Sequence, residues 1–243
     1  MKDQLDLMVR SGNAIIALES RDEEGAVDLV RGLAEGAHRT LFEWSMTSGL
    51  KRILPKLANI GIEPGKPTKA LEYILENEGE KKELYLFKDI ASHARDPQVL
   101  RLLRDIYLRD NVCLILVDSE SLPEGLKRLC VTLTLPLPTT AELEAVIKET
   151  FRKVHESSVN EVSSSLQKRD LEQMAHTLRG LTAQEAGRVV ASVIHDDYML
   201  SAADIPRLVE AKRNRLASTG CLEAINVNVR IDEIGGLTRL KAW

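Results

Sequence analysis

Between residues 14 and 138 the chain alternates uninterrupted apolar runs with amphipathic stretches, and this alternation limits what it can fold into. The runs include AIIAL at 14–18, LYLF at 84–87 and VCLILV at 112–117. A strand that is apolar at every position is buried on both faces, as in a parallel sheet covered by helices. Amphipathic segments between such strands are typical of the covering helices. The pattern predicts an α/β domain over residues 1–138 with about five mostly parallel strands, flanked by helices.

After residue 139 the apolar runs end and amphipathic segments follow one another, separated by polar breaks. The four helix candidates are AELEAVIKETFRKVH, DLEQMAHTLRG, TAQEAGRVVASVIHDDYM and AADIPRLVEAKRNRL. Residues 139–217 are therefore predicted to form a small four-helix domain, and residues 218–243 a linker that leads into a further domain. The stretch between RTLFEW and ELYLFKDI is expected to hold two helix-like segments. Ser20 with Glu23 is expected to cap a helix, and Asp96 before Pro97 another.

Composition excludes several classes of function. The formal net charge is −4, and no stretch interleaves Lys and Arg with aromatics, so nucleic-acid binding is not expected. No apolar run approaches membrane-spanning length, and MKDQLDLMVR at the N-terminus lacks the apolar segment of a secretion signal. Cys113, Cys130 and Cys221 form no CxxC pair and are expected to be reduced thiols. A cytoplasmic protein with no membrane partner is the expectation.

An α/β domain of this kind followed by four helices resembles the layout of the AAA+ ATPases, which belong to the P-loop NTPase class. Their phosphate loop, G-x-x-x-x-G-K-[ST], lies between the first strand and the next helix. Here the first apolar run is followed by RDEEGAVDL, whose acidic residues would repel a triphosphate. The one Gly-Lys pair, Gly65-Lys66, lies elsewhere and is followed by Pro67, so we interpret it as a turn. The resemblance therefore extends to the layout but not to the phosphate loop.

The run LYLF is followed by Lys88 and Asp89. In nucleotide-hydrolysing folds this strand ends in an acid that holds magnesium, and a lysine there would oppose the cation or replace it as a fixed charge. Solvated groups at a strand end are the alternative interpretation. A different hypothesis joins Asp89 with Glu19 and Asp118 as carboxylates at neighbouring strand ends, in a carboxylate-dependent α/β enzyme.

Four further polar residues occupy positions that AAA+ proteins use. Asp118 and Ser119 follow VCLILV, where such folds place a nucleotide sensor; helix capping is the alternative. Arg128 lies where an arginine finger reaches into a neighbouring subunit, and Arg188 where a second sensor stands. A surface arginine is the alternative for both. We expect no metal site, because the histidines and acids show no ligand spacing.

The last residues, IDEIGGLTRLKAW, resemble the D-x-x-G-G-L-x-x-L-K-x-W start of the ATPase domain in the Ycf-type AAA+ proteins, named for conserved plastid reading frames. The matching positions are Asp232, Gly235, Gly236, Leu237, Leu240 and Trp243. The resemblance extends to the early LDLMVRSGNAIIALESRDEE, to LYLFKDI, to LPLPTTAELEAVI and to GLTAQEA. It implies that the chain is the degenerate AAA+-like N-terminal region of such a protein. We expect the tail to pack poorly in this chain alone.

The function that this resemblance implies is a non-catalytic regulatory or assembly module of an ATP-dependent remodelling ATPase. It implies no cofactor in this chain, and ATP and magnesium in the full-length protein. The implied partners are the AAA+ domain of the same protein, neighbouring subunits of a ring and an unidentified protein. Two alternatives remain at this point, namely the carboxylate-dependent enzyme and a protein-interaction module that binds no nucleotide.

Overall fold

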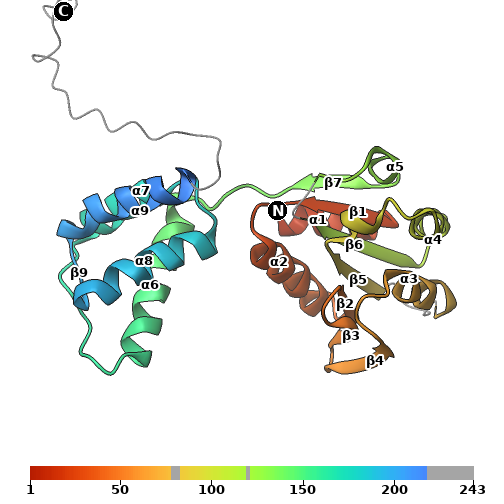
Figure 1. The fold of residues 1–243 in the computed structure, drawn as a ribbon, viewed down its shortest axis with the longest axis horizontal. Helices are drawn as coiled ribbons and strands as arrows, with labels where there is room; N and C mark the ends of the chain where they lie inside the picture. Colours follow the sequence, from red (N-terminus) through yellow and green to blue (C-terminus); the bar gives the residue numbers. More distant parts are fainter. Residues whose placement is uncertain (78–82, 119–120, 218–243) are drawn as a thin grey trace, which may run out of the picture. The chain divides into compact units, whose positions relative to one another are not determined.

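A computed structural model of the chain describes residues 1–77, 83–118 and 121–217. They divide into two compact units (Figure 1). The first, called the α/β unit below, comprises Met1–Thr139 with Thr182–Gln184. The second, called the helical unit, comprises Thr140–Leu181 and the residues from Glu185 on.

The α/β unit is built on a seven-stranded sheet in the order β4-β3-β2-β5-β6-β1-β7. The strands are β1 (Ile15–Glu19), β2 (Leu41–Ser45), β3 (Gly49–Leu54), β4 (Ala58–Ile62), β5 (Glu83–Lys88), β6 (Val112–Asp118) and β7 (Val131–Thr134). Five adjacent strands of this sheet are parallel to one another, in the order β2-β5-β6-β1-β7. At one edge, β3 pairs antiparallel with β2, and β4 pairs antiparallel with β3. The predicted mostly parallel α/β sheet is confirmed, and the predicted strand number was too low.

The two additional strands come from the stretch that was expected to hold two helix-like segments. Only its second part is helical, as α3 (Pro67–Glu76); the first part is the β3–β4 hairpin. Gly49 and Gly61 both have positive φ, a conformation that a regular helix does not contain. Burial alternates along β4 between half-buried and exposed residues, so this edge strand lacks the continuous apolar run of the central strands.

Helices cover both faces of the sheet. One face packs against α1 (Lys2–Arg10) and α2 (Glu23–Gly36), and the other against α3 and α4 (Pro97–Tyr107), as Figure 1 shows. Along β5, Leu84 and Leu86 enter the first core, whereas Tyr85 and Phe87 enter the second. This alternation explains why the central strands are apolar at every position. Short helices η1 (Ile90–His93) and α5 (Glu124–Lys127) follow β5 and precede β7.

The helix starts correct one capping prediction and agree with another. The N-cap of α2 is Asp22, whose carboxylate accepts a hydrogen bond from the Gly25 N–H at 3.0 Å, rather than Ser20. Ser20 instead exchanges hydrogen bonds with the backbone of Asp22. A carboxylate two residues nearer the helix competes successfully for the cap position. Asp96 caps α4 as predicted, by accepting from the Gln98 N–H at 2.8 Å.

The helical unit contains α6 (Thr140–Ser157), α7 (Lys168–Leu178), α8 (Ala183–Asp197), the short η2 (Ala202–Asp204) and α9 (Ile205–Ala217). Met174, Leu178, Val190, Ile194 and Leu208 lie in its apolar core. The predicted helical C-terminal part is confirmed, although a two-residue parallel pairing of β8 (Ser163–Ser164) with β9 (Met199–Leu200) was not expected. Within the described ranges, every helix is too short or too polar to cross a membrane.

Candidate functional site at the carboxyl edge of the sheet

The parallel strands bring several of the predicted polar residues to one edge of the sheet. Glu19 ends β1, Lys88 ends β5 and Asp118 ends β6, and these three strands are adjacent in the order β5-β6-β1. Glu19 and Asp118 are register partners, and the Asp89 N–H donates to the carbonyl of Val117 at 3.0 Å. We call this the carboxyl edge. Open α/β sheets bind their ligands there.

The connection from β1 to α2 at this edge consists only of residues 20–22. Asp22 caps the helix, and Glu23 and Glu24 follow in its first turn. The N–H groups at a helix N-terminus bind anions because they lack partners within the helix. Here a side-chain carboxylate already uses that position, and two more negative charges surround it. The arrangement disfavours a phosphate at the start of α2.

Removal of this cap should weaken the α/β unit measurably. We expect Asp22→Ala to lower the free energy of unfolding by about 1 kcal/mol, because the Gly25 N–H loses its acceptor. Urea denaturation followed by circular dichroism measures the change. The control is Asp28→Ala on the same helix, whose side chain is 75% exposed and lies 3.6 Å from Arg31. Equal losses in both variants would show that the cap has no special role.

Lys88 makes two ion pairs at the carboxyl edge. Its Nζ lies 3.0 Å from Oε1 of Glu43 on β2 and 3.5 Å from Oε1 of Glu23 on α2. These three residues form what we call the Lys88 cluster. A magnesium ligand at this position would be an acid, whereas here a cation stands between two acids. In the described part of the chain, no three His, Cys, Asp or Glu side chains gather so as to hold a metal ion.

Asp118 and Asp89 shape the turn that follows β5. Asp118 Oδ1 accepts a hydrogen bond from the Ala91 N–H at 2.6 Å, and the Asp89 carbonyl accepts one from the Ser92 hydroxyl at 3.0 Å. Asp89 has a φ of 55°, in the left-handed region that Asp tolerates better than most residues. The Asp118 carboxylate therefore accepts from an N–H in the first turn of η1, as in the helix-capping role that was the alternative to a nucleotide sensor.

Cys130, which directly precedes β7, is a thiol on which Asp118 acts electrostatically. Burial, with a smaller contribution from the charge of Asp118, raises the pKa of Cys130 to about 12. Its Sγ also lies 3.2 Å from the carbonyl of Leu126 as a hydrogen-bond donor. The thiol is therefore protonated near neutral pH, and a protonated thiol is a poor nucleophile.

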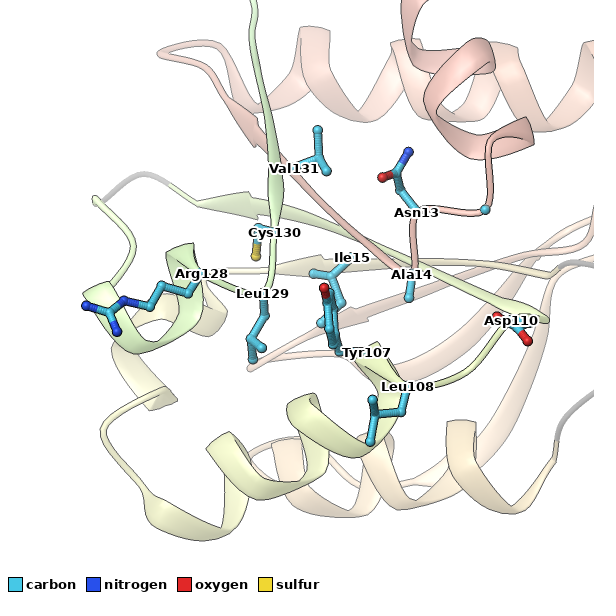
Figure 2. A pocket seen from close by; sticks show the side chains of 11 residues that line it. Asn13, Ala14, Ile15, Tyr107, Leu108, Asp110, Arg128, Leu129, Cys130 and Val131 are labelled. Carbon is cyan, nitrogen blue, oxygen red and sulfur yellow. The ribbon is translucent and has the colours of Figure 1, made fainter.

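A cavity of about 480 Å³ lies at the opposite, amino edge of the sheet (Figure 2). Ile15 and Val131, the first residues of β1 and β7, help to line it, together with Asn13, Tyr107, Asp110 and Arg128. The Arg128 side chain extends away from the other labelled residues in Figure 2. Arg128 therefore does not join the carboxyl-edge residues of its own chain.

The remaining predicted residues lie apart from both places. Arg188 is an exposed residue of α8 in the helical unit. Ser119 and the whole tail motif from Asp232 to Trp243 lie outside the described residues. One residue of the carboxyl edge, Glu43, was not singled out from the sequence. The signal for it was a single carboxylate inside the apolar run LFEW.

Comparisons with known proteins identify relatives along the whole chain. A family model described as the SpoVK-like AAA ATPase N-terminal domain matches residues 1–135, and one described as the second domain matches residues 141–219. The AAA domain-containing protein ycf46 of Trieres chinensis is 24% identical over 246 residues, covering 99% of this chain and 47% of that protein. The resemblance to Ycf-type proteins is thereby confirmed. The chain spans about half the length of the curated relatives it matches.

Solved structures of AAA proteins share the fold. The structure of C. elegans PCH-2 aligns with a TM-score of 0.59 at 13% identity, covering 90% of this chain and 68% of that chain. A structure described as the basis for katanin self-assembly aligns with a TM-score of 0.55 at 12% identity, covering 86% and 77%. At such identities the likeness concerns the fold alone.

Proposed function

Because the chain belongs to the SpoVK-like AAA ATPase family, we propose that it is a non-catalytic regulatory or assembly module of an ATP-dependent remodelling ATPase. The observation that carries this proposal is the start of α2, where Asp22 accepts a hydrogen bond from the Gly25 N–H. In a nucleotide-hydrolysing domain of this layout, those N–H groups belong to the phosphate. Here the protein's own carboxylate accepts from one of them, the Gly25 N–H.

The cation at the end of β5 supports the same proposal. Catalysis of phosphoryl transfer depends on a metal ion that neutralises the developing charge on the phosphate oxygens. Lys88 already forms ion pairs with the nearby acids Glu43 and Glu23, so these acids are engaged without a metal. The residues present at this edge therefore fit neither the magnesium nor the triphosphate. ATP and magnesium belong, in this proposal, to the rest of a longer protein.

The proposed partners follow from the length of the relatives and from the family. The chain corresponds to about half of the ycf46 proteins it matches. We therefore propose that residues 232–243 begin an AAA+ ATPase domain of the same protein and that the whole assembles into a ring. Arg128, which is exposed and directed away from its neighbours in Figure 2, is the residue that we propose reaches an adjacent subunit. In this proposal the domain binds no nucleotide, so Asp118, Ser119 and Arg188 do not act as nucleotide sensors.

The test is ATP turnover by residues 1–243. We expect no magnesium-dependent release of phosphate above the rate in buffer, because the sequence contains no G-x-x-x-x-G-K-[ST] motif and β5 ends in a lysine. A chain extended through the downstream ATPase domain serves as the positive control. Turnover by residues 1–243 alone would overturn the proposal.

A module that binds no nucleotide and acts only through protein contacts is the second candidate function. The observation that favours it is the set of exposed apolar side chains at the amino-edge cavity, where Tyr107 is 48%, Leu108 73% and Val131 40% exposed. Such groupings mark interaction surfaces. Titration with fluorescently labelled ATP tests this candidate, because saturable binding by residues 1–243 would eliminate the pure interaction module.

A further inference from the structure

We infer that the Lys88 ammonium does the structural work of a bound divalent cation, by tying α2, β2 and β5 together at the carboxyl edge without any ligand. This inference goes beyond the proposed function, because it concerns what holds the three elements together rather than whether the edge turns over ATP. It predicts that added magnesium leaves the stability of the parent protein unchanged.

The three residues of the Lys88 cluster come from three separate elements. Glu23 is the first residue of α2, Glu43 is central in β2, and Lys88 is the last residue of β5. The Lys88 side chain is 20% exposed and the Glu43 side chain 17%, so their pair, with 3.0 Å between nitrogen and oxygen, is largely shielded from water. Glu23 is 52% exposed and lies at 3.5 Å, as the outer member. Salt screens a shielded pair less than an exposed one.

The charges explain why this position needs a cation. Without Lys88, the carboxylate of Glu43 would remain largely buried beside that of Glu23, and a buried carboxylate without a cation is strongly unfavourable. Divalent metals satisfy such oxygen clusters in many α/β sites. An ammonium group has three donors and one positive charge, and it can bridge two carboxylates in the same way. The fixed cation thus holds the three elements together without a metal ion.

The first test removes the charge and keeps most of the side-chain volume. We expect Lys88→Met in the chain of residues 1–243 to lower the Tm by about 3–6 °C. Lys66→Met is the matched control, because Lys66 also pairs with a glutamate, Glu63, at 2.6 Å, but the two side chains are 57% and 71% exposed. The control should leave the Tm nearly unchanged. Equal Tm values for the parent and Lys88→Met would overturn the inference.

A second variant distinguishes loss of charge balance from loss of packing. Adding Glu43→Gln to Lys88→Met removes the carboxylate that was left without its cation, and should restore at least half of the lost Tm. A larger loss in the double variant would contradict the inference. If Lys88→Met does not fold, the single variant Glu43→Gln in the parent is the test, because Lys88 keeps its pair with Glu23 and the protein should fold with a lowered Tm. An unchanged Tm would contradict the inference.

The decisive test replaces the ammonium with a metal. Lys88→Asp places a third carboxylate at the cluster, and we expect added Mg²⁺ to raise the Tm of this variant by about 3 °C while leaving the parent unchanged. If the position could not hold a cation in place of the ammonium, there would be no such rescue. If Mg²⁺ shifted both proteins equally or neither, the inference would be wrong. These measurements involve no nucleotide, so their failure is distinct from a finding of ATP turnover.

Discussion

Replacing Phe87 with alanine should lower the free energy of unfolding of the α/β unit by about 3–5 kcal/mol, the largest loss we expect from a single side chain. Phe87 is fully buried in β5 and stacks on Trp44 of the neighbouring strand, with ring centroids 5.1 Å apart. Alanine would leave a cavity beside a second large ring, and close packing of the interior limits how far neighbours can collapse into it. Because Lys88 follows directly, the variant should also loosen the Lys88 cluster.

Urea denaturation measures this loss, and tryptophan fluorescence in a Trp243→Phe background localises it, because Trp44 is fully buried against Phe87. The control is Leu108→Ala, since Leu108 is 73% exposed and its truncation should change stability by less than about 0.5 kcal/mol. A loss below about 1 kcal/mol for Phe87→Ala would mean that the sheet core repacks freely around β5.

The central strands were predictable because they are buried on both faces, so that consecutive residues are all apolar. Alternate side chains of LYLF pack into the cores on the two faces of the sheet. Both cores are apolar, so the run is apolar at every position. The edge hairpin lacks this signal, because β4 has one face half-buried and the other exposed. Its glycines and the short alternation were the available cues, and both are weak beside the strong pattern of the strands that follow.

The candidate site was predictable only in part, for a different reason. Lys88 and Asp118 could be placed at strand ends, since a strand end is a local property of the chain. Glu43 could not be assigned to Lys88, because their pairing depends on β2 lying next to β5, which is a property of the sheet order. The capping error at α2 arose within three residues, where Ser20 and Asp22 compete for one role. Capping preferences alone do not decide which of two neighbouring polar residues becomes the N-cap.

The β3–β4 hairpin, which was not predicted from the sequence, should show the second large loss of stability, because its packing depends on one glycine. Gly49 begins β3 with a φ of +65°, and a Cβ added there would lie 2.1 Å from the carbonyl oxygen of Ile62. The clashing atom belongs to the backbone of the paired β4 and cannot rotate away as a side chain could. We expect Gly49→Ala to lower the free energy of unfolding by about 3–5 kcal/mol, through backbone strain combined with displacement of β4.

Gly61 provides the matched comparison, because it also has a positive φ, +81°, but an added Cβ would meet nothing within 4 Å. Gly61→Ala should therefore show only the conformational penalty of the left-handed region, about 1–2 kcal/mol. The difference between the two variants in urea denaturation isolates the clash from the strain. Equal losses would mean that β4 shifts to admit the Cβ, and that the contact between Gly49 and Ile62 does not fix the position of this edge. A clear difference would show that the missing Cβ at Gly49 allows β4 to pack closely against β3.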